Sequence, residues 1–222
     1  MTPQTIITEV RKLIQDAAGD RFSDSDLVGF VNQAIKRMVS LRPDLFVTSA
    51  AVETTDDVVE QSLPTSAVRL LEIFSVVGGS AVTEVDRETM DQMYPEWVTE
   101  ASGTPVNWIR HPRKPTGYFL YPRPSASVQL NTQYVDTPSD YTLSATITGL
   151  PESYFTAIID CVVFLAESVD AESVGNDRAK FYYDNFLEAL GIDQNQRAVV
   201  DAESGLVGTQ QQRRRSQQNG NS

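Results

Sequence analysis

One stretch restricts the fold of this chain more than any other: RFSDSDLVGFVNQAIKRMVSLRPDLF, residues 21–46. Ser23 followed three residues later by Asp26 is a short capping box, a sequence signal for the start of a helix. Apolar residues then recur at helical spacing until Pro43, where the proline disfavours a further helical turn. The stretch therefore predicts a sharply bounded helix with one apolar face and no reactive side chain.

Three further segments have apolar residues at the same spacing. Thr2 and Pro3 suit the start of a helix that ends near Gly19. The short link from this helix to the next one favours an antiparallel pair. Two more helices are expected late in the chain, one starting at Pro151 and one capped by Gly191.

The segment between these helix pairs has a different pattern. Its apolar residues fall in short β-branched or aromatic runs, divided by Gly, Pro and Asp. We expect a small antiparallel sheet with hairpin turns at Asp56-Asp57 and Gly78-Gly79, interrupted by a short helix over residues 86–97. Since the helices precede and follow the strands rather than alternating with them, the pattern predicts the α+β class.

The last stretch, GTQQQRRRSQQNGNS, is polar and has no apolar side chain, so it cannot bury enough surface to fold alone. We expect an arm that becomes ordered on a partner; the alternative is a disordered, solubilising end. The candidate partner-binding residues of the arm are Gln210, Gln211, Gln212, Arg213, Arg214 and Arg215.

The hydrophobic content of 41% allows a packed core. The patterns together predict an α+β chain with a bundle of about four helices, an inserted antiparallel β domain and an extended C-terminal arm. The bundle takes residues 1–45 and 150–191, the β domain residues 46–149, and the flexible arm residues 192–222.

The chain carries a net charge of −12 at pH 7 and has an isoelectric point near 4.5. Tight binding of nucleic acid needs a basic surface, so nucleic acid is not expected as a tightly bound ligand. An acidic wall repels phosphates, which suits a surface along which DNA slides. No apolar run approaches the ~18 residues needed to span a bilayer, so no membrane partner is expected.

The motifs of common catalytic and metal sites are missing from the sequence. It contains no phosphate-binding glycine loop, no CxxC and no HExxH, and one histidine with one cysteine cannot form a common zinc site. We expect His111 at a hairpin end, and Cys161 buried on an apolar helix as a small hydrophobe. No catalytic residue, metal or cofactor is therefore predicted.

Aromatic and basic residues interleave in NWIRHPRKPTGYFLYPRP, residues 107–124. The favoured interpretation is a hairpin whose aromatic residues alternate between core and surface, with cations at a tip where an acidic neighbouring subunit docks. The alternative is a site for single-stranded nucleic acid, because bases stack on aromatic rings set among basic side chains. The candidate partner-binding residues of this hairpin are Trp108, Arg110, Arg113, Lys114, Tyr118 and Arg123.

Several short segments follow one another in a characteristic order: SLRPDLF, VRLLEI, VDRETMDQMYPEW, TPVNWIRHPRKPTGYFLYPRP and DAESVGNDRAKFYYDNFLEALG. Over roughly residues 5–191 this order resembles the head-to-tail adaptor, or connector, proteins of short-tailed bacteriophages. The Pro-x-x-Trp step common in that family has a different spacing here, with Pro95 and Trp97 separated by one residue. The other matching positions are Arg42, Pro43, Asp44, Asp170, Ala171, Glu172, Gly175 and Asn176.

The resemblance implies a structural virion protein of the head–tail interface, made in the host cytoplasm. It implies a homo-oligomeric ring of about twelve subunits between the portal protein and the downstream nozzle or tube. Genomic DNA would pass through this ring without sequence-specific binding. We expect the C-terminal arm to bind the portal, and the hairpin to meet the tail protein or a neighbouring subunit.

Two other functions stay open at the level of sequence. A tail-associated peptidoglycan hydrolase would use a pair of carboxylates, and acidic residues are abundant although none is marked by its context. A nucleic-acid-binding accessory protein would act through the basic aromatic hairpin. The expected role is nevertheless structural rather than enzymatic, in virus assembly and DNA ejection.

Overall fold

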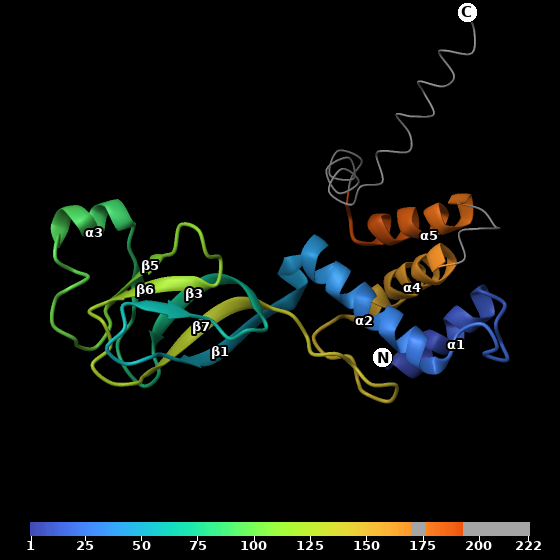
Figure 1. Cartoon of the computed structure of the whole chain (residues 1–222), viewed down its shortest axis with the longest axis horizontal. Coiled ribbons are helices and arrows are strands. Elements are labelled where there is room, and N and C mark those ends of the chain that lie inside the picture. Colours follow the sequence, from blue (N-terminus) through green and yellow to red (C-terminus); the bar gives the residue numbers. More distant parts are fainter. Residues whose placement is uncertain (170–175, 193–222) are drawn as a thin grey trace, which may run out of the picture. The chain divides into compact units, whose positions relative to one another are not determined.

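The computed structural model describes residues 1–169 and 176–192 (Figure 1). Over these residues the chain contains five α-helices and two β-sheets, which confirms the expected α+β class. The described residues form two compact units. One takes Met1–Ile35 with the described part of Tyr141–Ser222, and the other takes Lys36–Asp140.

The predicted boundaries of the helical and β domains, at residues 45 and 149, stay a prediction. Ile192 is the last described residue, so the predicted C-terminal arm lies outside the described part of the chain apart from this one position. None of the described helices is both long and apolar enough to span a membrane.

The first unit is built from helices. Its elements are α1 (Pro3–Leu13), the first part of α2 (Asp24–Leu41), the 3-10 turn η2 (Glu152–Tyr154), α4 (Phe155–Val169) and α5 (Asn176–Ala189). Every residue of α4 from Ala157 to Val163 is buried, including Cys161 as expected. α4 packs against both α1 and α5, so its apolar surface holds this unit together.

Two predicted helix starts, those at Thr2 and Ser23, are confirmed by their side-chain contacts. The helix expected to start at Pro151 begins instead at Phe155, because Pro151 precedes the 3-10 turn η2, and the first helix ends at Leu13 rather than near Gly19. Thr2 caps α1 by accepting a hydrogen bond at Oγ1 from the amide of Thr5, over 3.3 Å. Ser23 and Asp26 form the predicted capping box of α2. The Asp26 amide donates to the Ser23 hydroxyl over 3.2 Å, and the Ser23 amide donates to the Asp26 carboxylate over 3.0 Å.

The predicted cap of the last helix is confirmed as well. Gly191 has a φ of +71°, the left-handed conformation that glycine adopts without a steric penalty. Its amide donates to the carbonyl oxygen of Glu188 over 2.9 Å, and the amide of Ile192 donates to that of Leu187 over 3.0 Å. These two bonds form a Schellman motif, which satisfies the last carbonyl groups of the helix.

The second unit contains the two sheets. Its elements are η1 (Pro43–Phe46), β1 (Val47–Glu53), β2 (Glu60–Ser62), β3 (Ala67–Val76), β4 (Thr83–Glu84), α3 (Arg87–Met93), β5 (Asn107–Arg110), β6 (Gly117–Tyr121) and β7 (Gln129–Asp136). One sheet has the order β1-β7-β3 and is antiparallel throughout. The other has the order β2-β6-β5-β4, with β4 parallel to β5 and the remaining pairs antiparallel.

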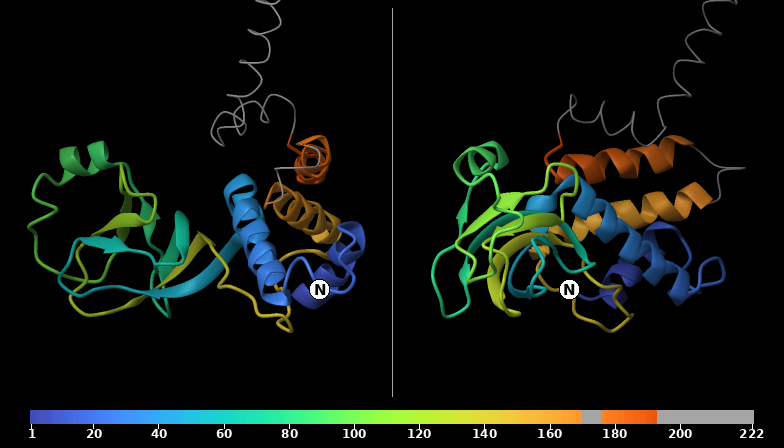
Figure 2. Two further views of the ribbon diagram at one scale, coloured as in Figure 1. Left: turned by 45° about the vertical axis from the view of Figure 1, so that its right-hand side comes forward. Right: turned by 60° about the vertical axis from the view of Figure 1, so that its left-hand side comes forward.

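The β unit is layered. The main core lies between the two sheets and includes Leu70, Trp108 and Leu130. A second apolar cluster joins Ile109 and other residues of the four-stranded sheet to the segment around α3, so this sheet is covered on both faces (Figure 2). Alternate residues of β5 and β6 therefore serve two different cores, as the pleat of a strand requires.

Two details of the β prediction differ from the structure. A single antiparallel sheet was expected, whereas the strands divide between two sheets and one pair is parallel. Asp56-Asp57 does not close a hairpin, because β1 pairs with β7 and β2 pairs with β6. The turn at Gly78-Gly79 is confirmed: the amide of Val76 donates to the carbonyl oxygen of Ser80 over 3.0 Å, and Gly78 has a φ of +69°.

Candidate functional site

The candidate site is the β5–β6 hairpin with its turn at residues 111–116. Trp108 and Tyr118, two of the predicted partner-binding residues, are fully buried between the two sheets. Burial raises the pKa of the Tyr118 hydroxyl to about 12. These two aromatic side chains build the core of the unit, so any contact with a partner falls to the exposed residues of the hairpin.

Arg110 connects the two sheets. Its Nη1 donates to the carbonyl oxygen of Leu70 over 2.9 Å, and its Nη2 donates to that of Leu71 over 3.0 Å. Its Nε lies 3.1 Å from the carboxylate of Glu84, and the guanidinium carbon is 5.0 Å from the ring centroid of Trp108. The side chain of Arg110 is thus occupied within the unit, in contacts that demand the planar fork of arginine.

His111 organises the turn of the hairpin. Its Nδ1 accepts hydrogen bonds from the amides of Arg113, over 3.1 Å, and Lys114, over 2.9 Å. Its ring stacks on Phe119 at 5.1 Å between centroids, and the amide of Gly117 closes the turn on the carbonyl oxygen of Lys114. The predicted position of His111 at a hairpin end is confirmed, whereas its bonding role was not anticipated.

The remaining cations of the hairpin differ in how they are neutralised. Lys114 forms an ion pair with Glu60, and its hydrogen bond lowers the pKa of that carboxyl group. Arg123 lies 3.1 Å from the carboxylate of Asp57. Arg113 is exposed, and its guanidinium has no hydrogen bond or ion pair within the described part of the chain. Among the cations of the described hairpin, Arg113 therefore differs from Arg110 and Lys114 in having an unpaired guanidinium.

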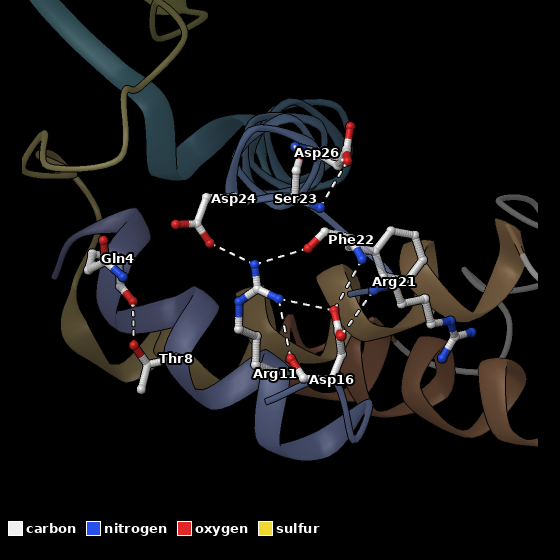
Figure 3. Close-up of polar contacts among 9 residues, drawn as sticks. All are labelled: Gln4, Thr8, Arg11, Asp16, Arg21, Phe22, Ser23, Asp24 and Asp26. Carbon is white, nitrogen blue, oxygen red and sulfur yellow. Dashed lines mark hydrogen bonds and ion pairs between the residues drawn. The ribbon is translucent and has the colours of Figure 1, made fainter. Parts of the chain in front are cut away.

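The helical unit contains a second polar cluster, centred on Arg11 (Figure 3). Its guanidinium lies 3.0 Å from Asp16 and 2.7 Å from Asp24, and it donates to the carbonyl oxygen of Phe22 over 3.0 Å. Asp16 also accepts hydrogen bonds from the amides of Arg21 and Phe22, each over 3.1 Å. These contacts join the end of α1 to the start of α2, so this cluster fixes the α1–α2 connection.

Burial alone would raise the pKa of the Asp16 carboxyl group. The hydrogen bonds from the Arg21 and Phe22 amides and the charge of Arg11 outweigh that effect and lower the pKa below its ordinary value of 3.8. The lowered pKa keeps the Asp16 carboxylate ionised at neutral pH, the form that pairs with Arg11.

Within residues 1–169 and 176–192, no group of three or more His, Cys, Asp or Glu side chains could hold a metal ion. The predicted partner-binding residues of the arm, Gln210, Gln211, Gln212, Arg213, Arg214 and Arg215, lie outside the described residues.

Comparison with known proteins gives one result that bears on function. No curated protein matches the chain in sequence. The family model described as SU10 adaptor protein matches residues 1–214, which is nearly the whole chain. The chain therefore belongs to the SU10 adaptor protein family, a family of phage head-to-tail adaptors and so of virion components.

Proposed function

We propose that this chain is one subunit of a ring that joins the portal of a short-tailed phage to the downstream nozzle or tail tube. The observation that carries the proposal is the family match over residues 1–214. About twelve copies would surround the DNA channel, in line with closed cyclic symmetry. The ring takes part in virus assembly and lets the genome pass during ejection.

The helices supply the stiffness that such a ring needs. We propose that α1, α2, α4 and α5 act as one bundle, followed by an extended arm. Support comes from α4, which packs on α1 and α5, and from helix ends that are held by specific caps. A rigid, chemically inert subunit can repeat around an axis without paying for ordering at each interface.

The two predicted partner surfaces have separate tasks in this proposal. The basic arm, with Arg213, Arg214 and Arg215, binds the portal. The exposed part of the hairpin meets the tail protein or a neighbouring subunit, and Arg113 with its free guanidinium favours that surface. The charge of −12 per chain, multiplied around the ring, repels DNA phosphates and keeps the channel open without sequence-specific binding.

The proposed role is structural and not enzymatic, in a virion protein that is made in the host cytoplasm. The experiment that tests it mixes the purified full-length chain with the portal protein of the same phage and follows co-sedimentation. We expect stable co-sedimentation and no cleavage of cell-wall substrate in a zymogram. A chain that stays unbound, or that clears the zymogram, contradicts the proposal.

A further inference from the structure

The surface around the end of α3 combines apolar and acidic residues. On its inner side, Met90 and Trp97 pack against the four-stranded sheet. Three large apolar side chains of the same segment stay in contact with solvent: Met93 is 63% exposed, Tyr94, whose ring also contacts Tyr121, 44%, and Val98 50%. Large apolar side chains that stay exposed within one short segment are candidates for contact with a partner.

The same segment is strongly acidic. Residues 84–100 contain six acidic residues and one arginine. Glu96 is exposed, and its carboxylate has no hydrogen bond or ion pair among the residues that the structure describes. We name this surface the α3 face and define it by Met93, Tyr94, Glu96 and Val98. It calls for a partner surface that is basic and also offers apolar contact.

The turn of the β5–β6 hairpin has the complementary chemistry. Residues 111–116, HPRKPT, contain no acidic residue, and the exposed pair Arg113-Lys114 lies between the exposed Pro112 and Pro115. His111 already holds this turn in shape through the amides of Arg113 and Lys114. A preorganised loop loses little conformational freedom when it binds, so its contacts translate more fully into affinity.

Within one copy, the α3 face and the turn lie at opposite ends of the same hairpin. Arg110 pairs with Tyr118 next to the turn, whereas Asn107 pairs with Tyr121 at the far end of the ladder. The ring of Tyr94 lies 5.3 Å from the ring of Tyr121, which places the α3 face at that far end. Two different and complementary surfaces on one subunit are what a head-to-tail contact between copies requires.

We therefore propose that the hairpin turn of one copy docks on the α3 face of the next copy in the ring. The Arg113 guanidinium pairs with the Glu96 carboxylate of the neighbour, while Pro112 and Pro115 cover the exposed apolar side chains. The contact is heterologous, so it generates a ring when the rotation between copies closes. The inference rests on the proposed ring and names the surfaces that hold it together.

Charge reversal tests this pairing in the full-length chain. Arg113→Glu and Glu96→Arg, made singly and together, are mixed with the portal protein, and the number of bound copies is measured by native mass spectrometry. The matched control is Arg69→Glu, which reverses an exposed arginine on β3 of the same unit. We expect each single variant to need roughly tenfold more protein to fill the ring, the double variant to recover, and the control to behave as the wild type.

The failure of this inference can be told apart from a failure of the proposed function. Wild-type chain that does not bind the portal contradicts the proposed function itself. Wild-type binding together with single variants that fill the ring equally well overturns the pairing alone, and so does a double variant that does not recover. Single variants that fill the ring but no longer hold the downstream tail protein assign the surface to that protein, which also overturns the contact between copies.

Discussion

Arg110 of β5 donates a hydrogen bond from Nη1 to the carbonyl oxygen of Leu70 in β3, over 2.9 Å, and so ties the two sheets of the β unit together. The same guanidinium covers the buried ring of Trp108. One side chain thus joins backbone, aromatic core and the carboxylate of Glu84. Arg110 was predicted from the sequence to bind a partner, whereas in the structure its side chain stabilises the β unit.

Arg110→Ala is expected to destabilise the β unit by roughly 2–3 kcal/mol, because it removes charge-assisted hydrogen bonds and a cation–π contact together. Both tryptophans of the chain, Trp97 and Trp108, lie in this unit, so urea unfolding followed by tryptophan fluorescence reports on it directly. Arg113→Ala is the control and should change stability by no more than about 0.5 kcal/mol. Equal stability of the two variants would contradict the structural role of Arg110.

Asp16→Asn is expected to weaken the helical unit at neutral pH, because it removes the charge that faces Arg11. The folded pKa of Asp16 lies below the ordinary 3.8, so its contribution to stability is complete above that value and is lost as pH falls through the folded pKa. Far-UV circular dichroism in urea between pH 2 and 7 measures the effect. The wild type should lose stability on the acid side more steeply than the variant; parallel curves would argue against the ion pair.

Asp160 changes the stability of the fold with pH in the opposite direction to Asp16. Burial in α4 raises the pKa of its carboxyl group to about 6, and the group has no hydrogen bond or ion pair within the described residues. Since the folded state holds the proton more tightly than the unfolded state, this residue costs stability as pH rises from 3.8 to about 6, and the cost persists above. Asp160→Asn should therefore raise the Tm by a few °C at pH 7.5.

The gain from Asp160→Asn should shrink below pH 4, where the wild-type carboxyl group is protonated in both states. The control is Glu188→Gln, an exposed carboxylate on α5. Thermal melts at pH 4 and pH 7.5 measure the Tm of the wild type and of both variants. A variant that is no more stable than the wild type at pH 7.5 would mean that Asp160 is better solvated than its burial indicates.

Truncation separates the proposed arm from the fold. Ile192 is 7% exposed and its amide completes the cap of α5, so a chain ending at Ile192 should keep the Tm of the full chain. Removal of Ile192 as well should cost about 1–3 kcal/mol. Both truncations should weaken attachment to the portal, measured by co-sedimentation. Attachment that survives loss of residues 193–222 would contradict the role assigned to the arm.

The parts of the fold that sequence predicts well are those set by neighbours in the chain. The capping box of Ser23 and Asp26 and the glycine cap at Gly191 depend on residues within a few positions, and both are confirmed. Strand pairing depends on distant segments. Val52 pairs with Leu130, so no local signal separates one sheet from two or shows that Asp56-Asp57 leads from one sheet to the other.

In the candidate site, too, the features set by neighbouring residues could be predicted, and those set by distant segments could not. The hairpin and the position of His111 follow from adjacent residues, whereas the carboxylates that neutralise its cations come from other strands and their connections. Glu60 and Asp57 precede the hairpin by about fifty residues or more, and only the folded register brings them beside Lys114 and Arg123. The free guanidinium of Arg113 therefore becomes visible only after the others are accounted for.

The central claim is that copies of this chain form a closed ring on the portal. Native mass spectrometry of the full-length chain mixed with its portal protein measures this directly, as the number of chains in one complex. A single dominant complex with about twelve bound chains is the expected result. A complex with one or two chains per portal, unchanged as the chain is added in excess, would contradict the ring.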